Sequence, residues 1–328
     1  MSQHSTPVPG PAGRGGTPGR DAVGVDIGGS STVTILLDDR GQVVARDVMV
    51  TRTGAEQIAS DVGHAVRRVL ATAGVDPADV AGIGVGVPGV VDPESGTVAN
   101  AVNLGIEGSA PLAALVSRAL DGLPVRLEND LNAAVLGTAQ HLAQAGEGPV
   151  DDLAFIALGT GLAAGLMLDG RLRRGPHRAA GEIGHLRYVP DGLPCKCGQS
   201  GCLERYASGS ALDAAWPSRT GRPAPVEVFE AAAAGDEHAV RVRDEFLAAV
   251  AGAVRVLVLT CDVGRIVIGG GVSQLGEPLL RGLVTELDRQ AASSPFLAAA
   301  HLPSRVRLAP AGVPLGAVGA ALVGRGGH

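Results

Sequence analysis

Three glycine-rich turns, each directly after an apolar stretch typical of a strand, constrain the fold of this chain most. The turns are DIGGSS from residue 26, LGTGLAAG from residue 158 and VIGGGV from residue 267. Backbone N–H groups in such turns can point at phosphate oxygens without obstruction by side chains. Because helical stretches alternate with the strands, the sequence predicts an α/β fold.

A duplicated hairpin is the second constraint. Residues 26–39 (DIGGSSTVTILLDD) align with residues 157–170 (ALGTGLAAGLMLDG). The identical pairs are Gly28 with Gly159, Leu37 with Leu168 and Asp38 with Asp169. Each copy reads as strand, glycine turn, strand and acidic turn, so we infer an internal duplication. A dinucleotide-binding turn would instead open a helix, whereas GTGLAAG runs on into the strand-like GLMLD.

The rest of the chain gives a coarser pattern. Apolar residues at helical spacing predict a helix from about residue 54 to 73. We expect a loop over 91–108, a mostly helical region over 209–262, and a C-terminal helix. The Pro- and Gly-rich residues 1–21 are predicted to be a disordered tail.

Composition excludes several classes of protein. The 328 residues carry a net charge of −6 and only 2% aromatic side chains, which argues against a nucleic-acid partner. The single lysine, Lys196, lies between two cysteines, so a Walker A loop, a protein-kinase lysine and a pyridoxal Schiff base are excluded. The N-terminal stretch has no apolar segment typical of a signal peptide, and prolines interrupt the charge-free run 308–324. We therefore expect a cytoplasmic protein without a membrane partner.

The asparagines gather in one part of the sequence. All four lie within a short stretch, and an amide offers the donor and acceptor that a polyhydroxylated ligand requires. They are Asn100, Asn103, Asn129 and Asn132. Turn chemistry alone would explain Asn100. Asp130, at the end of the strand PVRLEND, is placed either as a general base or, like Asn129, as the N-cap of the following helix. The residues alone leave both readings open.

Three cysteines and one histidine form the clearest constellation. His185, Cys195, Cys197 and Cys202 fall on a Pro- and Gly-rich loop, and three thiolates with one imidazole match a closed tetrahedral zinc site. Such a fully coordinated metal is structural and would not activate water. Zinc would also fix Glu182 and Glu204 beside the loop, as candidate ligand-binding carboxylates. The fourth cysteine, Cys261, reads as a buried free thiol.

These residues together resemble the ROK (repressor, ORF, kinase) family, and within it the bacterial ATP-dependent glucokinases. The resemblance extends from Val23 to Gly324. The motifs that carry it are DIGG at 26–29, GVPGVVDPESG at 86–96, END at 128–130, GTG at 159–161, AAGEIGH at 179–185 and CKCGQSGCLE at 195–204. It implies a two-lobed, actin-like sugar kinase fold with an interlobe cleft, each lobe built on a ribonuclease-H-like core. The expected lobes are residues 22–128 with 310–328, and residues 129–309 with a zinc loop at 185–202.

The resemblance also implies roles for single residues. Asp130 would be the general base that takes the proton of the 6-hydroxyl of the sugar, most simply glucose. Other residues would hold the remaining hydroxyls, with His185 on zinc through one ring nitrogen and on sugar through the other. These are Asn103, Asn129, Glu182, His185 and Glu204. ATP and Mg²⁺ would bind at Asp26, Gly28, Gly29, Ser30, Gly159, Thr160, Gly161, Gly269, Gly270 and Gly271. A homodimer or a dimer of dimers is expected.

The sequence departs from the family pattern at a few positions. Ala163 and Ala164 replace two glycines of the second turn, which would matter if either position needs a positive φ. Ser31 and Ile106 also differ from many glucokinases. Two alternatives follow, namely a kinase for N-acetylmannosamine, mannose, fructose or allose, and a sugar-binding sensor with weakened catalysis. A transcription regulator is disfavoured, because about twenty residues before the first strand cannot hold a DNA-binding domain.

Overall fold

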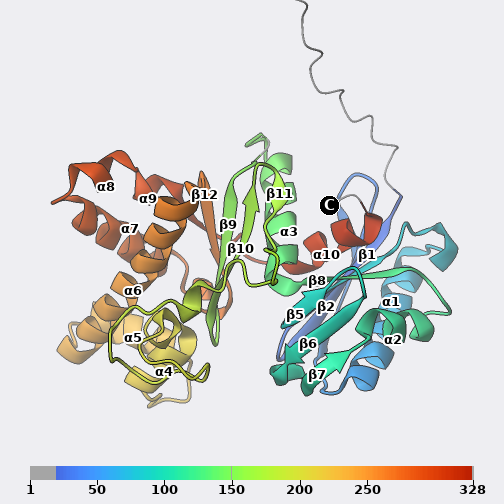
Figure 1. Cartoon of the computed structure of the whole chain (residues 1–328), viewed down its shortest axis with the longest axis horizontal. Helices are drawn as coiled ribbons and strands as arrows, with labels where there is room; N and C mark the ends of the chain where they lie inside the picture. The colour runs from blue at the N-terminus through green and yellow to red at the C-terminus, as the bar shows by residue number, and fades with distance from the viewer. Residues whose placement is uncertain (1–19, 149, 327–328) are drawn as a thin grey trace, which may run out of the picture.

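Two five-stranded sheets with the same strand pattern form the framework of the protein (Figure 1). The computed structural model describes residues 20–148 and 150–326, so nearly all of the predicted tail, 1–21, lies outside the described residues. The first sheet has the order β3 (Val43–Val50), β2 (Ser31–Leu37), β1 (Ala22–Ile27), β4 (Ile83–Val87), β8 (Val125–Asn129). The second has the order β11 (Arg171–Leu172), β10 (Leu162–Leu168), β9 (Leu153–Leu158), β12 (Arg265–Gly269), β13 (Val306–Leu308).

The internal duplication is confirmed by this topology. In each sheet the first three strands are antiparallel and the last two continue in parallel. The hairpin 22–27 and 31–37 recurs as 153–158 and 162–168, in the register that the sequence alignment predicts. The glycine turn therefore occupies the same place in both sheets.

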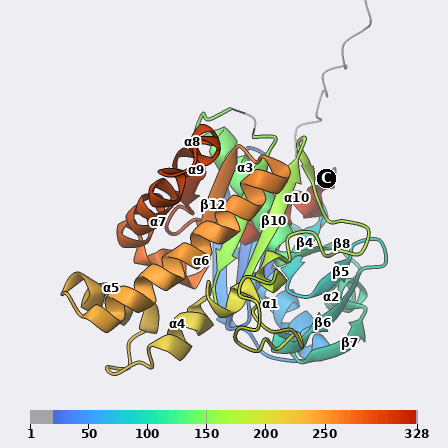
Figure 2. The same cartoon turned by 60° about the vertical axis from the view of Figure 1, so that its left-hand side comes forward.

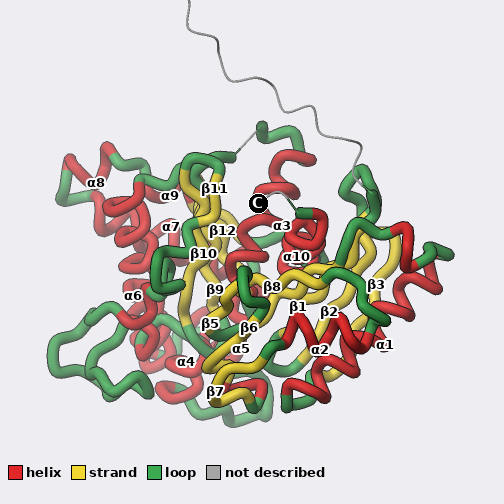
Figure 3. Tube along the Cα trace, turned by 45° about the vertical axis from the view of Figure 1, so that its right-hand side comes forward, coloured by secondary structure: helices red, strands yellow, loops and turns green. Residues whose placement is uncertain are grey.

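Two helices, α3 (Asp130–Gln144) and α10 (Leu315–Arg325), lie between the sheets (Figures 1 and 3). Helix α10 packs on β1 and β4, and α3 packs on β9 and β10. The two helices cross at glycines: a Cβ on Gly137 would lie 1.9 Å from the carbonyl oxygen of Leu315, and one on Gly319 would lie 1.7 Å from that of Ala133. Several of the chain's glycines thus serve close backbone approach, as well as turns.

The remaining helices cover the outer faces of the sheets. Helices α1 (Ala55–Ala73) and α2 (Leu112–Ala119) belong to the first half, and α1 confirms the helix predicted near 54–73. In Figure 2 the long helix α6 (Glu237–Cys261) runs across the second sheet. The other helices around it are α4 (Gly209–Ala215), α5 (Ala224–Ala233), α7 (Glu277–Ala291), α8 (Pro295–Ala299) and α9 (Leu302–Arg305). Short 3₁₀ turns are η1 (Pro77–Asp79), η2 (Val102–Leu104), η3 (Ile183–His185), η4 (Leu203–Arg205) and η5 (Gly271–Leu275).

The predicted loop over 91–108 is wrong, because this segment forms a small antiparallel sheet. Its strands are β5 (Val90–Asp92), β6 (Thr97–Ala101) and β7 (Ile106–Ala110). Val98 and Ile106 are buried in the first hydrophobic core, which gives the short strands a reason to form. Asn100, with φ 56°, and Gly105, with φ 70°, break the regular alternation and conceal the strands in the sequence. Asn100 thus shapes the backbone at an irregularity inside β6 and not at the turn that one reading predicted.

Cys261 also differs from expectation. It is the last residue of α6 and is half-buried, not fully buried, although it is free of disulfides. Over residues 20–148 and 150–326, every helix is too short or too polar to cross a lipid bilayer.

Candidate active site

Three neighbouring parallel strands bring the candidate catalytic residues to one edge of the first sheet. Strand β4 lies between β1 and β8, and its Gly86 pairs with Asp26 on one side and with Glu128 on the other. A Cβ on Gly86 would lie 3.6 Å from the Cα of Asp130. Strand β4 at Gly86 therefore lies directly against the first turn of helix α3, where Asp130 stands.

Asn129 takes the cap position of helix α3. Its Oδ1 accepts the backbone N–H groups of Leu131 at 3.0 Å and Asn132 at 3.2 Å, and its Nδ2 donates to the carbonyl of Gly89 at 3.3 Å. Asp130 is the first helical residue, and its carboxylate accepts the N–H of Leu131 at 3.0 Å. The N-cap is therefore Asn129. Asp130 does not cap the helix, and its carboxylate keeps acceptor positions beyond the one that binds Leu131, as a general base would need.

The carboxylate of Asp130 is a stronger base than that of a free aspartate. Its pKa is raised from 3.8 to about 6: burial is the main cause, the backbone N–H bond from Leu131 works against it, and the charge of Glu182 adds to the rise. Burial also raises the pKa of Asp26 to about 7, with the charge of Asp130 as the second cause. A carboxylate with a pKa near neutrality accepts a proton more readily than a free aspartate does.

A buried ion pair supports this strand end, and sequence reasoning missed it. The side chain of Glu128 is 2% exposed, and its Oε2 accepts from Arg174 Nε at 2.8 Å and Nη2 at 2.5 Å. Its Oε1 accepts from Asn132 Nδ2 at 2.9 Å and from the N–H of Asn129 at 3.0 Å. Because Arg174 follows β11 of the second sheet, this pair joins the two halves directly behind the candidate base.

A crevice between the two halves lies beside these residues. It has a volume of about 20 Å³ and is lined on one side by Gly89, Val91, Glu128, Asn129, Leu131 and Asn132, and on the other by Ala164, Arg174, Arg178, Ala180 and Glu182. Asn129 and the exposed Glu182, two of the predicted sugar ligands, therefore face one space. A third, Asn103, is exposed on η2, where its Cβ lies 3.9 Å from the Cβ position of Gly29 in the first turn.

The second and third glycine turns are packed together. Gly270 has a φ of 88°, and a Cβ on it would lie 2.5 Å from the carbonyl oxygen of Leu158, directly before Gly159. Glu204 braces the second turn, since its Oε2 accepts the N–H of Leu162 at 3.1 Å. No local pattern in the sequence predicts this contact. Ser210 on α4 adds a hydrogen bond of 2.6 Å to the carbonyl of Thr160.

The two alanines in the second turn fit their backbone. Ala163 and Ala164 lie within β10, paired with Ala157 and Ile156, and neither has a positive φ. The tight position is instead Gly181, with φ 95°, where a Cβ would lie 1.8 Å from the carbonyl oxygen of Ala164. The expected backbone penalty for alanine is therefore absent at both sites.

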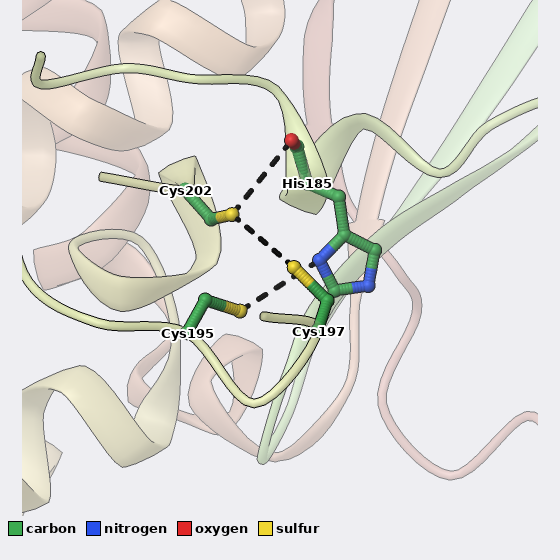
Figure 4. A group of neighbouring side chains, drawn as sticks. All are labelled: His185, Cys195, Cys197 and Cys202. Atoms are coloured by element: carbon green, nitrogen blue, oxygen red, sulfur yellow. Dashed lines mark hydrogen bonds between the residues drawn. The ribbon is translucent and has the colours of Figure 1, made fainter. Parts of the chain in front are cut away.

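The four predicted metal ligands come together (Figure 4). Their ligand atoms all lie within 4.8 Å of one another. Cys195 Sγ is 3.9 Å from His185 Nδ1, and Cys197 Sγ is 3.6 Å from Cys202 Sγ. Thiolates about 2.3 Å from a tetrahedral zinc lie roughly 3.8 Å apart, so the cluster has suitable dimensions. The other ring nitrogen of His185 points away from the sulfurs.

Comparison with known proteins shows that this architecture is similar to that of sugar kinases. A solved ROK family glucokinase from Streptomyces griseus, in complex with glucose and AMPPNP, superposes with a TM-score of 0.75 at 34% identity, over 93% of this chain and 99% of that one. Glucokinase from Halalkalibacterium halodurans is 33% identical over 280 residues, which is 79% of this chain and 82% of the relative. N-acetylmannosamine kinase from Haemophilus influenzae is 31% identical over 250 residues, 76% of this chain and 79% of the relative.

The duplicated sheets therefore form the actin-like fold of the sugar kinases. Residues 22–325 match the ROK family, and the chain belongs to that family.

Proposed function

We propose that the protein is an ATP-dependent hexose kinase that phosphorylates the 6-hydroxyl of glucose. The observation that carries this proposal is the carboxyl of Asp130, enclosed at a strand end with a pKa of about 6 and adjoining a crevice lined by Asn129 and Glu182. Relatives named glucokinase support the choice of glucose.

In the proposed reaction the sugar hydroxyl attacks the γ-phosphorus of ATP. The bond from O6 to phosphorus forms as the bond to the β-phosphate oxygen breaks, and Asp130 takes the hydroxyl proton. With a pKa near 6, Asp130 is mostly ionised at neutral pH, and it returns the proton to water after ADP leaves. Asn103, Asn129, Glu182, His185 and Glu204 orient the sugar by holding its other hydroxyls.

The glycine turns and Asp26 suit a nucleotide with its metal. The three turns offer backbone N–H groups to phosphates, and Asp26 supplies an oxygen donor of the kind that Mg²⁺ prefers. Burial first, and then the charge of Asp130, raise the pKa of Asp26, and a nearby cation would lower that pKa. When bound, Mg²⁺ neutralises charge on the phosphates.

Zinc is part of the proposal as a structural ion. His185, Cys195, Cys197 and Cys202 would hold it, and a closed site of this kind contributes folding energy. Metal on Nδ1 would fix the tautomer of His185 and would leave Nε2 for a sugar hydroxyl. We place the protein in the cytoplasm, where ligand thiols stay reduced. The two lobes of the proposed kinase are residues 22–128 with 310–328 and residues 129–309.

Another hexose is the second candidate, favoured by the relative named N-acetylmannosamine kinase. The alternative of a sugar-binding sensor was based on a backbone penalty at Ala163 and Ala164. Both residues have regular strand backbone, so that argument no longer supports it.

The test is coupled ADP release with ATP and Mg²⁺ over glucose, mannose, fructose, allose and N-acetylmannosamine. Glucose should give the highest kcat/KM, and an Asp130→Asn variant should lose turnover. ADP release that no sugar stimulates would contradict the proposed function.

A further inference from the structure

Arg178 has an unusual backbone for its residue type. Among the described residues, seven other than glycine have a positive φ; five are Asp or Asn, one is His301, and the seventh is Arg178 with φ 57°. Asp, Asn and His are the types enriched in this region, because a short polar side chain can bond locally. A long arginine has no such reason, and strained backbone of this kind clusters at ligand sites.

The side chain of Arg178 extends from the second half of the molecule to the first. It follows β11, and its Nη2 lies 3.4 Å from Asp92 Oδ1 on β5. The two side chains are 30% and 44% exposed. Ion pairs this open add little stability, and Asp92 already accepts a hydrogen bond of 2.7 Å from Ser95. Fold stability therefore does not account for an arginine at this strained position.

The position of Arg178 on the crevice supplies a different reason. Arg178 lines the crevice together with Asn129 and Glu182, opposite the strand end that carries Asp130. The space left, about 20 Å³, has room for about one water molecule. A hydroxyl held by Asn129 or Glu182 needs no more room than this, whereas a larger substituent would have to displace the arginine.

The charged side chains around the crevice determine which charge a bound sugar can carry. Arg174 is already neutralised by Glu128, and Arg178 faces Asp92, with Glu182 on the same wall. Asp130 adds a further carboxylate beside Glu182. The surroundings are thus acidic overall, which disfavours an anionic sugar and leaves neutral hexoses as the suitable class.

We propose that Arg178 is a specificity-determining residue, which closes the crevice behind Asn129 and Glu182 and restricts the site to hexoses with hydroxyl in place of acylamino substituents. This inference rests on the proposed function, since it takes those two residues as sugar ligands. Arg178 acts here by occupying space and by its pairing with Asp92, and it takes no part in proton transfer.

The test compares binding and turnover of glucose and N-acetylmannosamine in the wild-type chain and an Arg178→Gly variant. Glycine adopts the same φ without strain, so the variant should melt at the same or a higher temperature. Dissociation constants from calorimetry should favour glucose at least tenfold in the wild type, and this preference should fall tenfold or more in the variant. The matched control is His301→Gly, which relieves a positive φ away from the crevice and should leave the preference unchanged.

The outcomes separate the two proposals. A preference that stays within twofold in Arg178→Gly would overturn the role of Arg178, as would a wild type that binds N-acetylmannosamine at least as tightly as glucose. If sugars bind with the expected preference but none stimulates ADP release, the kinase proposal fails and the role of Arg178 stands. If neither sugar binds the wild type, both fail.

Discussion

Replacing Asp130 by asparagine should sharply reduce turnover and at the same time stabilise the fold at neutral pH. The folded pKa of about 6 lies above the 3.8 of a free aspartate, so the folded protein holds this proton more tightly than the unfolded chain does. The resulting stability is full below pH 3.8 and is lost as pH rises through 6. At about 1.4 kcal/mol per pKa unit, ionised Asp130 costs about 3 kcal/mol at pH 7 and about 1 kcal/mol at pH 4.5.

Asparagine retains the side-chain oxygen that accepts the N–H of Leu131 and carries no charge. Urea unfolding of Asp130→Asn should therefore show a gain that grows from pH 4.5 to pH 7, while ADP release falls by about 10²- to 10⁴-fold. Asp236→Asn is the control of opposite sign, because the N–H groups of Ala239 and His238 lower the pKa of that helix cap. A variant less stable than wild type at pH 7, or a gain independent of pH, would refute the electrostatic reasoning.

Three further predictions concern the metal cluster, the crossing of helices α3 and α10, and the buried ion pair of Glu128. Cys202→Ser should abolish binding of one zinc per chain, measured by elemental analysis, and lower the melting temperature; a chain purified without zinc yet equally stable would argue against the metal site. Gly319→Ala should destabilise the fold by about 1–3 kcal/mol in urea, because the methyl group meets the Ala133 carbonyl, whereas Gly108→Ala, in open space, should be neutral. Arg174→Met should destabilise the fold by about 3–5 kcal/mol by leaving the buried Glu128 unpaired, and adding Glu128→Gln should recover most of the loss; equal losses in both variants would mean that the arginine acts by packing.

Local patterns in the sequence were enough to predict the parts of the fold that repeat or that lie close in the chain. The duplicated hairpin follows from two short stretches with the same order of strand and glycine turn, and its register is confirmed. The metal ligands His185 and Cys202 fall within one loop, so their spacing alone brought them together as predicted. Asp130 could be placed because a strand and a helix meet at it.

Contacts between distant segments could not be predicted in this way. Arg174 and Glu128 are far apart in the chain, and no local pattern marks an arginine that will meet a buried carboxylate. The small sheet β5–β7 was missed because its strands are short and Asn100, with a positive φ, interrupts the alternation inside β6. The positive φ of Arg178 belongs to an irregular turn, in which its N–H bonds to the Gly175 carbonyl at 3.3 Å, and no glycine or asparagine marks that position in the sequence.

The pH dependence of glucose-stimulated ADP release tests the central claim most directly. If Asp130 is the base, kcat should rise with pH and reach half its maximum near pH 6, and it should fall about 10²- to 10⁴-fold in Asp130→Asn while glucose still binds. Glucose-stimulated turnover in Asp130→Asn within about tenfold of the wild type would contradict the account, because another group would then take the proton.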